Sequence, residues 1–559
     1  MEALKWAVVL CTLTLGVLGS EQQDGHPLVE TQYGKLQGKT LSAKGIDRTV
    51  NAFYGVPFAK PPVGSLRFAA PESPEAWSST REATNYAPMC VQDRHMMEQL
   101  VKAVNAKIYI PEVSEDCLYL NIFTPGDRVK GEKLPVMVFI HGGGLVMGGA
   151  MMFEGSALSA YENVVVVSIQ YRLGVLGFFS TGDDKAPGNY GFLDQVAALK
   201  WVQENIEDFG GDPGTVTIFG ESAGGVSVSS LVVSPLAKGL FHRAIAESGV
   251  AIMPALVARS TEEVVFISKI VANISGCVGD NLVDCLKAKS EEEIQAIGAA
   301  MQMMPLPASI DGVFFPKPPE QILADKEANR VPFMTGVTNQ EFGWILPSVM
   351  NITGFPGEMQ IETVQEILQK FPFLGIFSSA TSLLIDEYIG DKTDAAKIRT
   401  SFVDMVGDLV FVIPALKTAK YHRDSGNPTY FYEFQHRPLI FKESKPDFVN
   451  ADHGDELFFV IGGPFLKSDV LFKGDSNEEE EILSKTIMKY WGNFARSGDP
   501  NGPGLKHWPQ YNQDEYYLEL NLEQKATKQL KAQEYKFWTE ILPQRFQKLQ
   551  EEKGEHIEL

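Results

Sequence analysis

The stretch over residues 215–225, Thr-Val-Thr-Ile-Phe-Gly-Glu-Ser-Ala-Gly-Gly, constrains the fold of this chain more than any other. Its apolar, β-branched first half predicts a short buried strand, which runs directly into the pattern Gly-x-Ser-x-Gly. This pattern is typical of a sharp strand-to-helix turn with Ser222 at its apex. Glycine suits 220 and 224 because a β-carbon there would hold strand and helix apart. Ser222 is therefore a candidate nucleophile, although the pattern alone would also fit a Gly/Ser-rich loop.

The segments before this turn support the first interpretation. Residues 164–169 (Val-Val-Val-Val-Ser-Ile) are typical of a strand buried on both faces of a parallel sheet. Apolar residues then recur at spacings of three and four, which predicts a helix ending at Gly210-Gly211; they are Phe192, Val196, Leu199, Val202, Ile206 and Phe209. Such a βαβ unit places reactive groups beyond the carboxyl ends of its strands. We therefore expect an α/β fold.

Four motifs together resemble the type-B carboxylesterase family of the α/β-hydrolase fold. They are residues 219–225, 115–121 (Glu-Asp-Cys-Leu-Tyr-Leu-Asn), 55–62 (Gly-Val-Pro-Phe-Ala-Lys-Pro-Pro) and 490–496 (Tyr-Trp-Gly-Asn-Phe-Ala-Arg). The resemblance covers nearly the whole chain and, within the family, is greatest to the carboxylesterase 2 group. It implies a mostly parallel central sheet flanked by helices, with helical cap insertions, and hydrolysis of neutral xenobiotic and lipid esters by a serine esterase.

A run of glycines follows another predicted strand, residues 134–140. His141-Gly142-Gly143-Gly144 lets the backbone turn with its N–H groups facing a cavity, because no side chain blocks the approach. It matches the oxyanion element of lipases and esterases. By that resemblance the donors are the amides of Gly143, Gly144 and Ala223.

A serine hydroxyl needs a basic imidazole and a carboxylate that stabilises the charged ring. In the order of this fold both follow the serine. His453 and His436 both lie beyond the strand-like residues 430–434, and pattern alone leaves them as competitors. The string Asp-His-Gly-Asp-Glu over 452–456 matches the histidine motif of the family, which decides for His453.

The acid follows the predicted strand 332–337. Glu341 lies just past it and matches the Glu-Phe-Gly motif of the family, while Asp311 is the alternative on chain order. We expect Glu221 to line the pocket and to point away from the imidazole. Ser248 matches a residue near the site in the family.

Charge and missing motifs exclude other classes. The chain carries 49 basic and 71 acidic residues, a net charge of −22, which disfavours binding to nucleic acid. No Cys/His cluster with metal spacing or phosphate-binding glycine loop appears, so we expect neither metal nor cofactor. An adhesion protein of this fold would lack Ser222, whereas a serine peptidase would use the same groups.

Residues 1–20 predict a cleaved secretory signal, because Lys5 precedes an apolar run too short to span a bilayer comfortably. A single α/β-hydrolase domain would then occupy 21–559. Asn273 and Asn351 head glycosylation acceptor sequences.

The final residues, His556-Ile557-Glu558-Leu559, resemble a retrieval signal for the endoplasmic reticulum. Such a signal would bind the retrieval receptor and hold the protein in the lumen; if the signal were not used, the protein would be secreted. The alternative is a charged helical tail.

Signal removal would leave four cysteines, Cys90, Cys117, Cys277 and Cys285, in an oxidising compartment. Three pairings are possible. The family resemblance favours Cys90 with Cys117 and Cys277 with Cys285.

Substrate size preference follows only from the resemblance. The carboxylesterase 2 group implies esters with a small acyl group and a bulky alcohol. The methionine-rich residues 301–304 would suit a broad alcohol pocket, or they fill the core under a cap.

Overall fold

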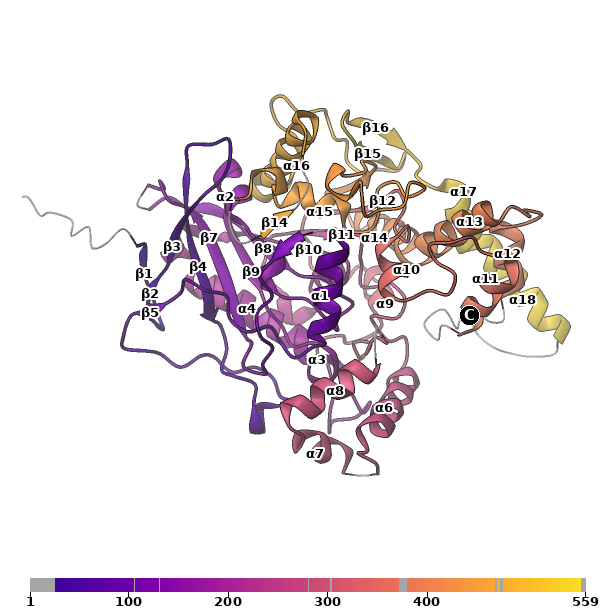
Figure 1. The fold of residues 1–559 in the computed structure, drawn as a ribbon, viewed down its shortest axis with the longest axis horizontal. Coiled ribbons are helices and arrows are strands. Elements are labelled where there is room, and N and C mark those ends of the chain that lie inside the picture. Colours follow the sequence, from indigo (N-terminus) through magenta and orange to yellow (C-terminus); the bar gives the residue numbers. More distant parts are fainter. Residues whose placement is uncertain are drawn as a thin grey trace, which may run out of the picture.

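The computed structural model describes residues 26–553, apart from 105, 130, 280, 302–303, 371–379, 468–469 and 473–475. Within this part of the chain one large sheet runs through the molecule, with helices packed on both faces (Figure 1). From edge to edge its eleven strands are β16 (Lys525–Lys528), β15 (Tyr516–Leu520), β13 (Thr429–Phe434), β12 (Phe333–Thr338), β11 (Arg243–Glu247), β10 (Gly211–Glu221), β8 (Leu134–Ile140), β9 (Val165–Ile169), β7 (Tyr119–Pro125), β4 (Thr49–Pro57) and β3 (Lys39–Ser42).

The central strands confirm the predicted, mostly parallel sheet. All neighbours from β9 through β8, β10, β11, β12 and β13 to β15 pair in parallel. Antiparallel strands stand only at the edges, where β16 adds to β15 on one side and β7, β4 and β3 follow β9 on the other. Because the carboxyl ends of parallel strands all point the same way, the loops that follow β8, β10, β12 and β13 gather along one side of the sheet.

Alternate side chains of β8 enter two separate hydrophobic cores. Val138 and its alternate neighbours pack with α4 (Tyr190–Asn205) and α5 (Ala223–Val233). Phe139 points to the opposite face and packs with α2 (Ser156–Glu162) and α16 (Glu478–Ser497). A strand covered by helices on both sides buries both of its faces, which explains the apolar run of this strand and of β9, in which only Ser168 is polar.

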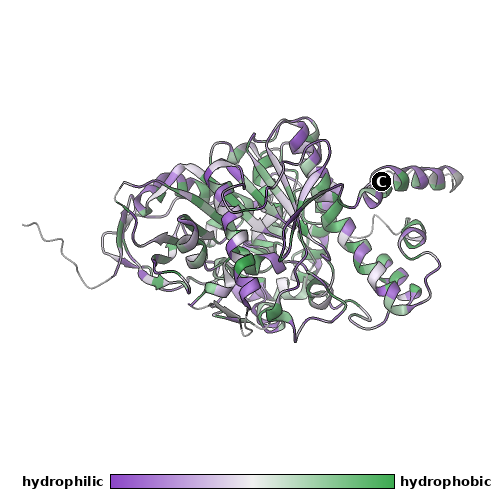
Figure 2. Ribbon diagram, turned by 90° about the horizontal axis from the view of Figure 1, so that it is seen from above, coloured by the Kyte–Doolittle hydropathy of each residue, from purple (hydrophilic) through white to green (hydrophobic). Residues whose placement is uncertain are grey.

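The cap insertions that the resemblance implies are helical and form two regions. The first contains α6 (Thr261–Ser275), α7 (Leu282–Lys287), α8 (Glu291–Met301) and α9 (Pro319–Ala324). The second contains α11 (Ile361–Lys370), α12 (Thr381–Tyr388), α13 (Ala395–Gly407), a π-helical turn (Asp408–Val412) and α14 (Ile413–Asp424). Figure 2 shows helices of the second region and the C-terminal helix projecting from the body of the molecule, with hydrophobic and hydrophilic faces side by side.

The described chain also contains several 3₁₀ turns and a second π-helical turn (Phe537–Ile541). The remaining α-helices are α1 (Arg94–Ala103), α3 (Gly174–Phe178), α10 (Ile345–Val349), α15 (Asp455–Val460), α17 (Ala532–Lys536) and α18 (Leu542–Lys553). The other strands are β1 (Leu28–Thr31), β2 (Gly34–Gln37), β5 (Arg81–Glu82), β6 (Ala106–Ile108) and β14 (Val470–Phe472).

The disulfide prediction is confirmed, since Cys90 is bonded to Cys117 and Cys277 to Cys285. The side chains of Asn273, in α6, and of Asn351 are exposed. None of the described helices is both long and apolar enough to cross a membrane. The predicted signal, residues 1–20, and the predicted retrieval tail, residues 556–559, lie outside the described residues.

Candidate active site

Ser222 stands at the turn between β10 and α5 with φ 59° and ψ −124°, a backbone conformation that a residue with a side chain rarely adopts. The glycines beside it make this turn possible. A β-carbon on Gly224 would lie 2.0 Å from the carbonyl oxygen of Ile140, and one on Gly220 would lie 2.8 Å from the carbonyl carbon of Gly224. The predicted reason for both glycines is therefore confirmed.

Glu341 and His453 meet at the same edge of the sheet, although 112 residues separate them. The Nδ1 of His453 lies 2.6 Å from Oε2 of Glu341. The other oxygen of Glu341 accepts hydrogen bonds from the amide of Thr338 (2.6 Å) and the hydroxyl of Ser248 (2.7 Å). These bonds fix the carboxylate, and only 2% of Glu341 is exposed. The ring of Phe411 packs against the imidazole, with 4.6 Å between centroids.

The two competing residues lie in other surroundings. The Nε2 of His436 lies 2.9 Å from Oε1 of the buried Glu480. Asp311 accepts hydrogen bonds from the amides of residues 313, 314 and 315 and so closes its own turn. The structure therefore brings Glu341, rather than Asp311, to His453.

Glu221 does not point away from the imidazole, so that expectation is wrong. Its Oε1 lies 3.0 Å from Nε2 of His453. Burial raises the pKa of Glu221, and the charge of His453 only partly offsets this. Burial by itself would lower the pKa of His453, but the charge of Glu221, followed by the hydrogen bond and charge of Glu341, outweighs burial and raises that pKa. The imidazole is thus held between two carboxyl groups.

Two further buried glutamates extend this acidic cluster. Oε1 of Glu456 accepts hydrogen bonds from Ser248 (3.2 Å) and the hydroxyl of Tyr432 (3.3 Å). Glu247 accepts one from the indole of Trp491 (2.7 Å). Burial, and then the neighbouring glutamates, raise the pKa of Glu456; burial raises the pKa of Glu247 to about 8. Glu247 therefore favours the neutral form at neutral pH, and burial of Glu456 acts in the same direction, which limits the negative charge around the imidazole.

Side chains also fasten the loop that carries the acid to the loop that carries the imidazole. Asp452 accepts hydrogen bonds from the amides of Trp344 (3.0 Å) and Ile345 (2.7 Å). In the other direction, Gln340 accepts from the amide of residue 450 and Asn339 from that of residue 451. Because each bond joins a side chain to the opposite backbone, the two loops hold each other in register.

The glycine loop, residues 141–149, lies across from Ser222. A β-carbon on Gly142 would come within 3.0 Å of the Cβ of Ser222, and Gly143 and Gly144 both have positive φ (101° and 63°). The carbonyl of Gly143 accepts hydrogen bonds from the amides of Val146 (3.1 Å) and Met147 (3.0 Å). Glycine is therefore required here by close approach and by backbone conformation.

A cavity of about 310 Å³ joins these parts, since Gly143, Gly144, Ser222, Glu221 and His453 all line it. Its remaining walls are mostly apolar and come from α1, α10, α15 and both cap regions, including the π-helical turn of the second. Six methionines contribute to them: Met97, Met147, Met151, Met152, Met253 and Met350. Such a site can hold an apolar molecule against a serine, an imidazole and a row of backbone amides.

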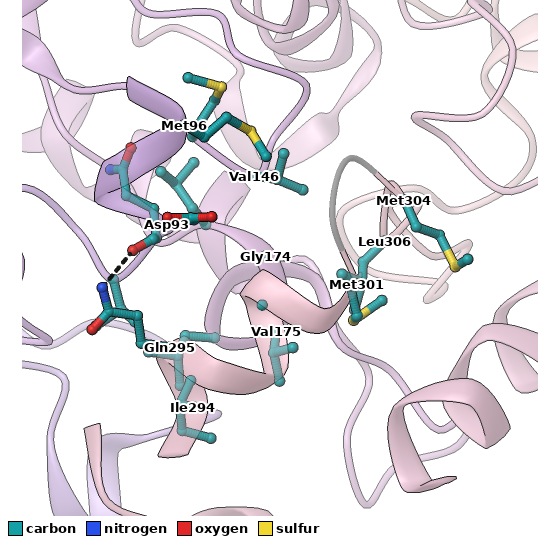
Figure 3. A pocket seen from close by; sticks show the side chains of 16 residues that line it. Asp93, Met96, Val146, Gly174, Val175, Ile294, Gln295, Met301, Met304 and Leu306 are labelled. Carbon is teal, nitrogen blue, oxygen red and sulfur yellow. Dashed lines mark hydrogen bonds between the residues drawn. The ribbon is translucent and has the colours of Figure 1, made fainter. Parts of the chain in front are cut away.

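Neither described methionine of the methionine-rich segment, Met301 or Met304, lines this cavity. Met301 and Met304 line a separate cavity of about 30 Å³, between α8 and the glycine loop (Figure 3). Gln302 and Met303 lie outside the described residues. Met301 is buried and fills core, which was the alternative interpretation of this segment.

Comparison with known proteins places the chain among esterases. A model described as "Carboxylesterase family" matches residues 25–538. The chain is 49% identical to a medium-chain fatty acyl-CoA hydrolase precursor of Anas platyrhynchos, over 97% of this chain and 98% of that protein. It is 49% identical to a liver carboxylesterase of Sus scrofa, over 96% of each. It is 50% identical to a cocaine esterase of Homo sapiens, over 99% of this chain and 98% of that protein.

Proposed function

Because this chain belongs to the carboxylesterase family and is a serine carboxylic ester hydrolase, we propose that Ser222, His453 and Glu341 perform its chemistry. The observation that carries this proposal is the 2.6 Å contact between Glu341 and His453 at a cavity that Ser222 also lines. The esterase relatives disfavour an adhesion protein of the same fold, and Ser222, which such a protein would lack, supports the proposed chemistry.

In the proposed mechanism His453 removes the proton of Ser222 as its oxygen attacks the ester carbonyl. Glu341 holds the ring through Nδ1 and stabilises the imidazolium that forms. The imidazolium then protonates the leaving alcohol, and an acyl-enzyme remains. Water, deprotonated by the same imidazole, releases the acid and restores the serine.

The developing oxyanion would be stabilised by the amides of Gly143, Gly144 and Ala223. Ala223 is the first residue of α5, so its N–H has no partner within the helix. Gly143 and Gly144 line the cavity beside the serine. Each well-placed donor of this kind contributes about 3 to 4 kcal/mol to transition-state stabilisation.

Ser222 is expected to be the single residue labelled by a fluorophosphonate, because the reagent reacts with the activated serine of such an enzyme. Mass spectrometry of the labelled protein tests the assignment, and a label on another residue contradicts it.

Glu221→Gln is expected to move the rising limb of the pH profile of kcat/KM to lower pH. The base must be a neutral imidazole, so activity rises as the pH passes the pKa of His453. The charge of Glu221 raises that pKa, and its removal therefore lowers it. Glu523→Gln, at an exposed position, is the matched control. A limb that stayed in place or moved to higher pH would contradict the electrostatic role of the contact.

The preferred substrates belong to the same proposal. The identities to known esterases do not separate the carboxylesterase 2 group from its relatives, and the preference for a small acyl group and a bulky alcohol rests on resemblance. Support comes from the apolar walls of the cavity, which offer extended contact area for the larger half of an ester. The acidic net charge of −22 disfavours polyanionic substrates.

An acetyl ester of a bulky apolar alcohol is expected to have a kcat/KM at least about 10-fold above that of the ethyl ester of a comparably bulky acid. The ratio reports differential transition-state binding, so both esters must be measured on the same enzyme preparation. A strong preference for the large acyl group would overturn the carboxylesterase 2 assignment, and ester hydrolysis itself would stand.

The cellular location of the protein is proposed from the sequences of its first 20 and last four residues. We propose that residues 1–20 direct the chain into the secretory pathway, that Asn273 and Asn351 are glycosylated, and that residues 556–559 retain the enzyme in the lumen of the endoplasmic reticulum. The two disulfides support an oxidising compartment, and the exposure of both acceptor asparagines supports their glycosylation.

Deletion of residues 556–559 is expected to move glycosylated enzyme from cells into their medium, because the retrieval receptor would lose its ligand. Immunoblots of cells and medium measure the shift. The double substitution His556→Lys with Ile557→Asp restores the standard Lys-Asp-Glu-Leu ending and should remain inside the cell. An unchanged distribution after deletion would refute retention by the tail.

A further inference from the structure

Gln92 is buried, with 4% of its surface exposed, and its side chain is fully occupied. Its Oε1 accepts a hydrogen bond from the amide of Gly148 (2.8 Å). Its Nε2 donates to the carbonyl of Gly148 (2.7 Å) and to that of Cys90 (2.9 Å). The side-chain amide thus pairs with both backbone groups of Gly148, as a neighbouring strand would. Gln92 is neither one of the three proposed catalytic residues nor one of the proposed oxyanion donors.

The backbone of Gln92 is itself held from two sides. Two residues earlier, Cys90 is bonded to Cys117, which shortly precedes β7. The carbonyl of Gln92 accepts a hydrogen bond from Nε2 of Gln295 in α8 (3.2 Å), which is the dashed line in Figure 3. A side chain anchored in this way to the sheet and to the first cap region can fix the position of what it binds.

Gly148 connects Gln92 to the first residues of the glycine loop. It has φ 114°, and a β-carbon on it would lie 2.4 Å from Nδ1 of His141, so the returning part of the loop lies directly on its first residue. Between them, the carbonyl of Gly143 accepts from the amides of Val146 and Met147. In a trans peptide the next N–H points opposite to that carbonyl, which turns the N–H of Gly144 away from the interior of the loop.

We propose that Gln92 is a positioning residue that holds the oxyanion donors of the glycine loop through its paired hydrogen bonds to Gly148. The inference rests on the proposed function, in which Gly143 and Gly144 stabilise the oxyanion. Gln92 itself does not line the large cavity. Loss of the Gln92 side chain should therefore reduce the stabilisation of the transition state and leave ground-state binding of the ester nearly unchanged.

Gln92→Met tests this, because methionine has a similar length and volume without the amide. We expect kcat to fall about 10- to 100-fold and KM to change less than about 3-fold, as for a small displacement of catalytic groups. A trifluoromethyl ketone, to which the serine adds reversibly with transfer of its proton to the imidazole, should bind more weakly by the same factor as kcat/KM. The matching methyl ketone, which mimics the ground state, should bind equally well. Gln99→Met, on an exposed position of α1, is the matched control.

Rates are taken per active site, titrated with a fluorophosphonate, so that partial unfolding does not imitate a catalytic defect. An unchanged kcat, or a lower kcat with unchanged affinity for the trifluoromethyl ketone, would overturn the proposal. If the variant fails to fold, hydrogen exchange in the wild-type enzyme decides: the amide of Gly148 should be protected, and exchange at the rate of an exposed loop would refute its bond to Gln92. Ser222→Ala measured in parallel separates the two proposals, since an active Ser222→Ala enzyme would refute the mechanism rather than the role of Gln92.

Discussion

Ser222→Ala is expected to lower kcat for ester hydrolysis by about 10⁵-fold or more, with little change in thermal stability. The hydroxyl is the only proposed group that forms the covalent intermediate, so the cavity and the amides would be left with binding alone. The fold should persist because the substitution removes one oxygen and alanine keeps the β-carbon at the turn. Steady-state kinetics with a chromogenic acetyl ester, together with thermal denaturation, measure both parts.

Ser230→Ala provides the control for this experiment. It makes the same substitution two turns further along α5, in the core and away from the cavity. It should retain the wild-type rate. If Ser222→Ala retained more than about 1% of the wild-type kcat, after contaminating wild-type enzyme had been excluded by labelling, the nucleophile would have to be sought elsewhere.

His453→Ala is expected to cause a loss of similar size, because serine and imidazole act as a unit and removal of either disables both. Glu341→Gln should cost less, about 10³- to 10⁴-fold in kcat, because its amide can face Nδ1 with an N–H and favour the wrong tautomer of the ring. The rates of both variants at saturating ester measure these effects. His436→Ala is the matched control and should stay active, since its ring is paired with Glu480.

The reverse result, an inactive His436→Ala and an active His453→Ala, would show that the base had been assigned to the wrong loop. A Glu341→Gln enzyme with wild-type kcat would transfer the orienting role to another carboxyl group.

The sheet could be predicted from the sequence because its strands carry local signals. Continuous apolar runs predicted β8 and β9 within one residue of their observed ends, and the elbow was predicted from the need for glycine on both sides of Ser222. These patterns depend on neighbours a few residues apart. Backbone sterics and two-sided burial are sufficient to produce them.

The surroundings of the imidazole could not be predicted in the same way. The contact of Glu221 with the imidazole has no signal in the sequence, because the turn geometry does not determine where a loop much later in the chain will lie. Glu456 belongs to the string that identified His453, yet its burial beside Ser248 depends on three loops meeting. Gln92 had no local signal, since its partner Gly148 is 56 residues away.

The bonds between the loops of Glu341 and His453 also determine how this part of the molecule can open. Asp452 joins the second loop to the start of α10, and Gln340 returns a bond to the first residues of that loop. Neither loop can leave its place without breaking the bonds of the other, so the two form one cooperative unit of local unfolding. Fluctuations that widen the cavity are therefore expected in its other walls, such as α1 and the cap helices, while Glu341 and His453 stay paired.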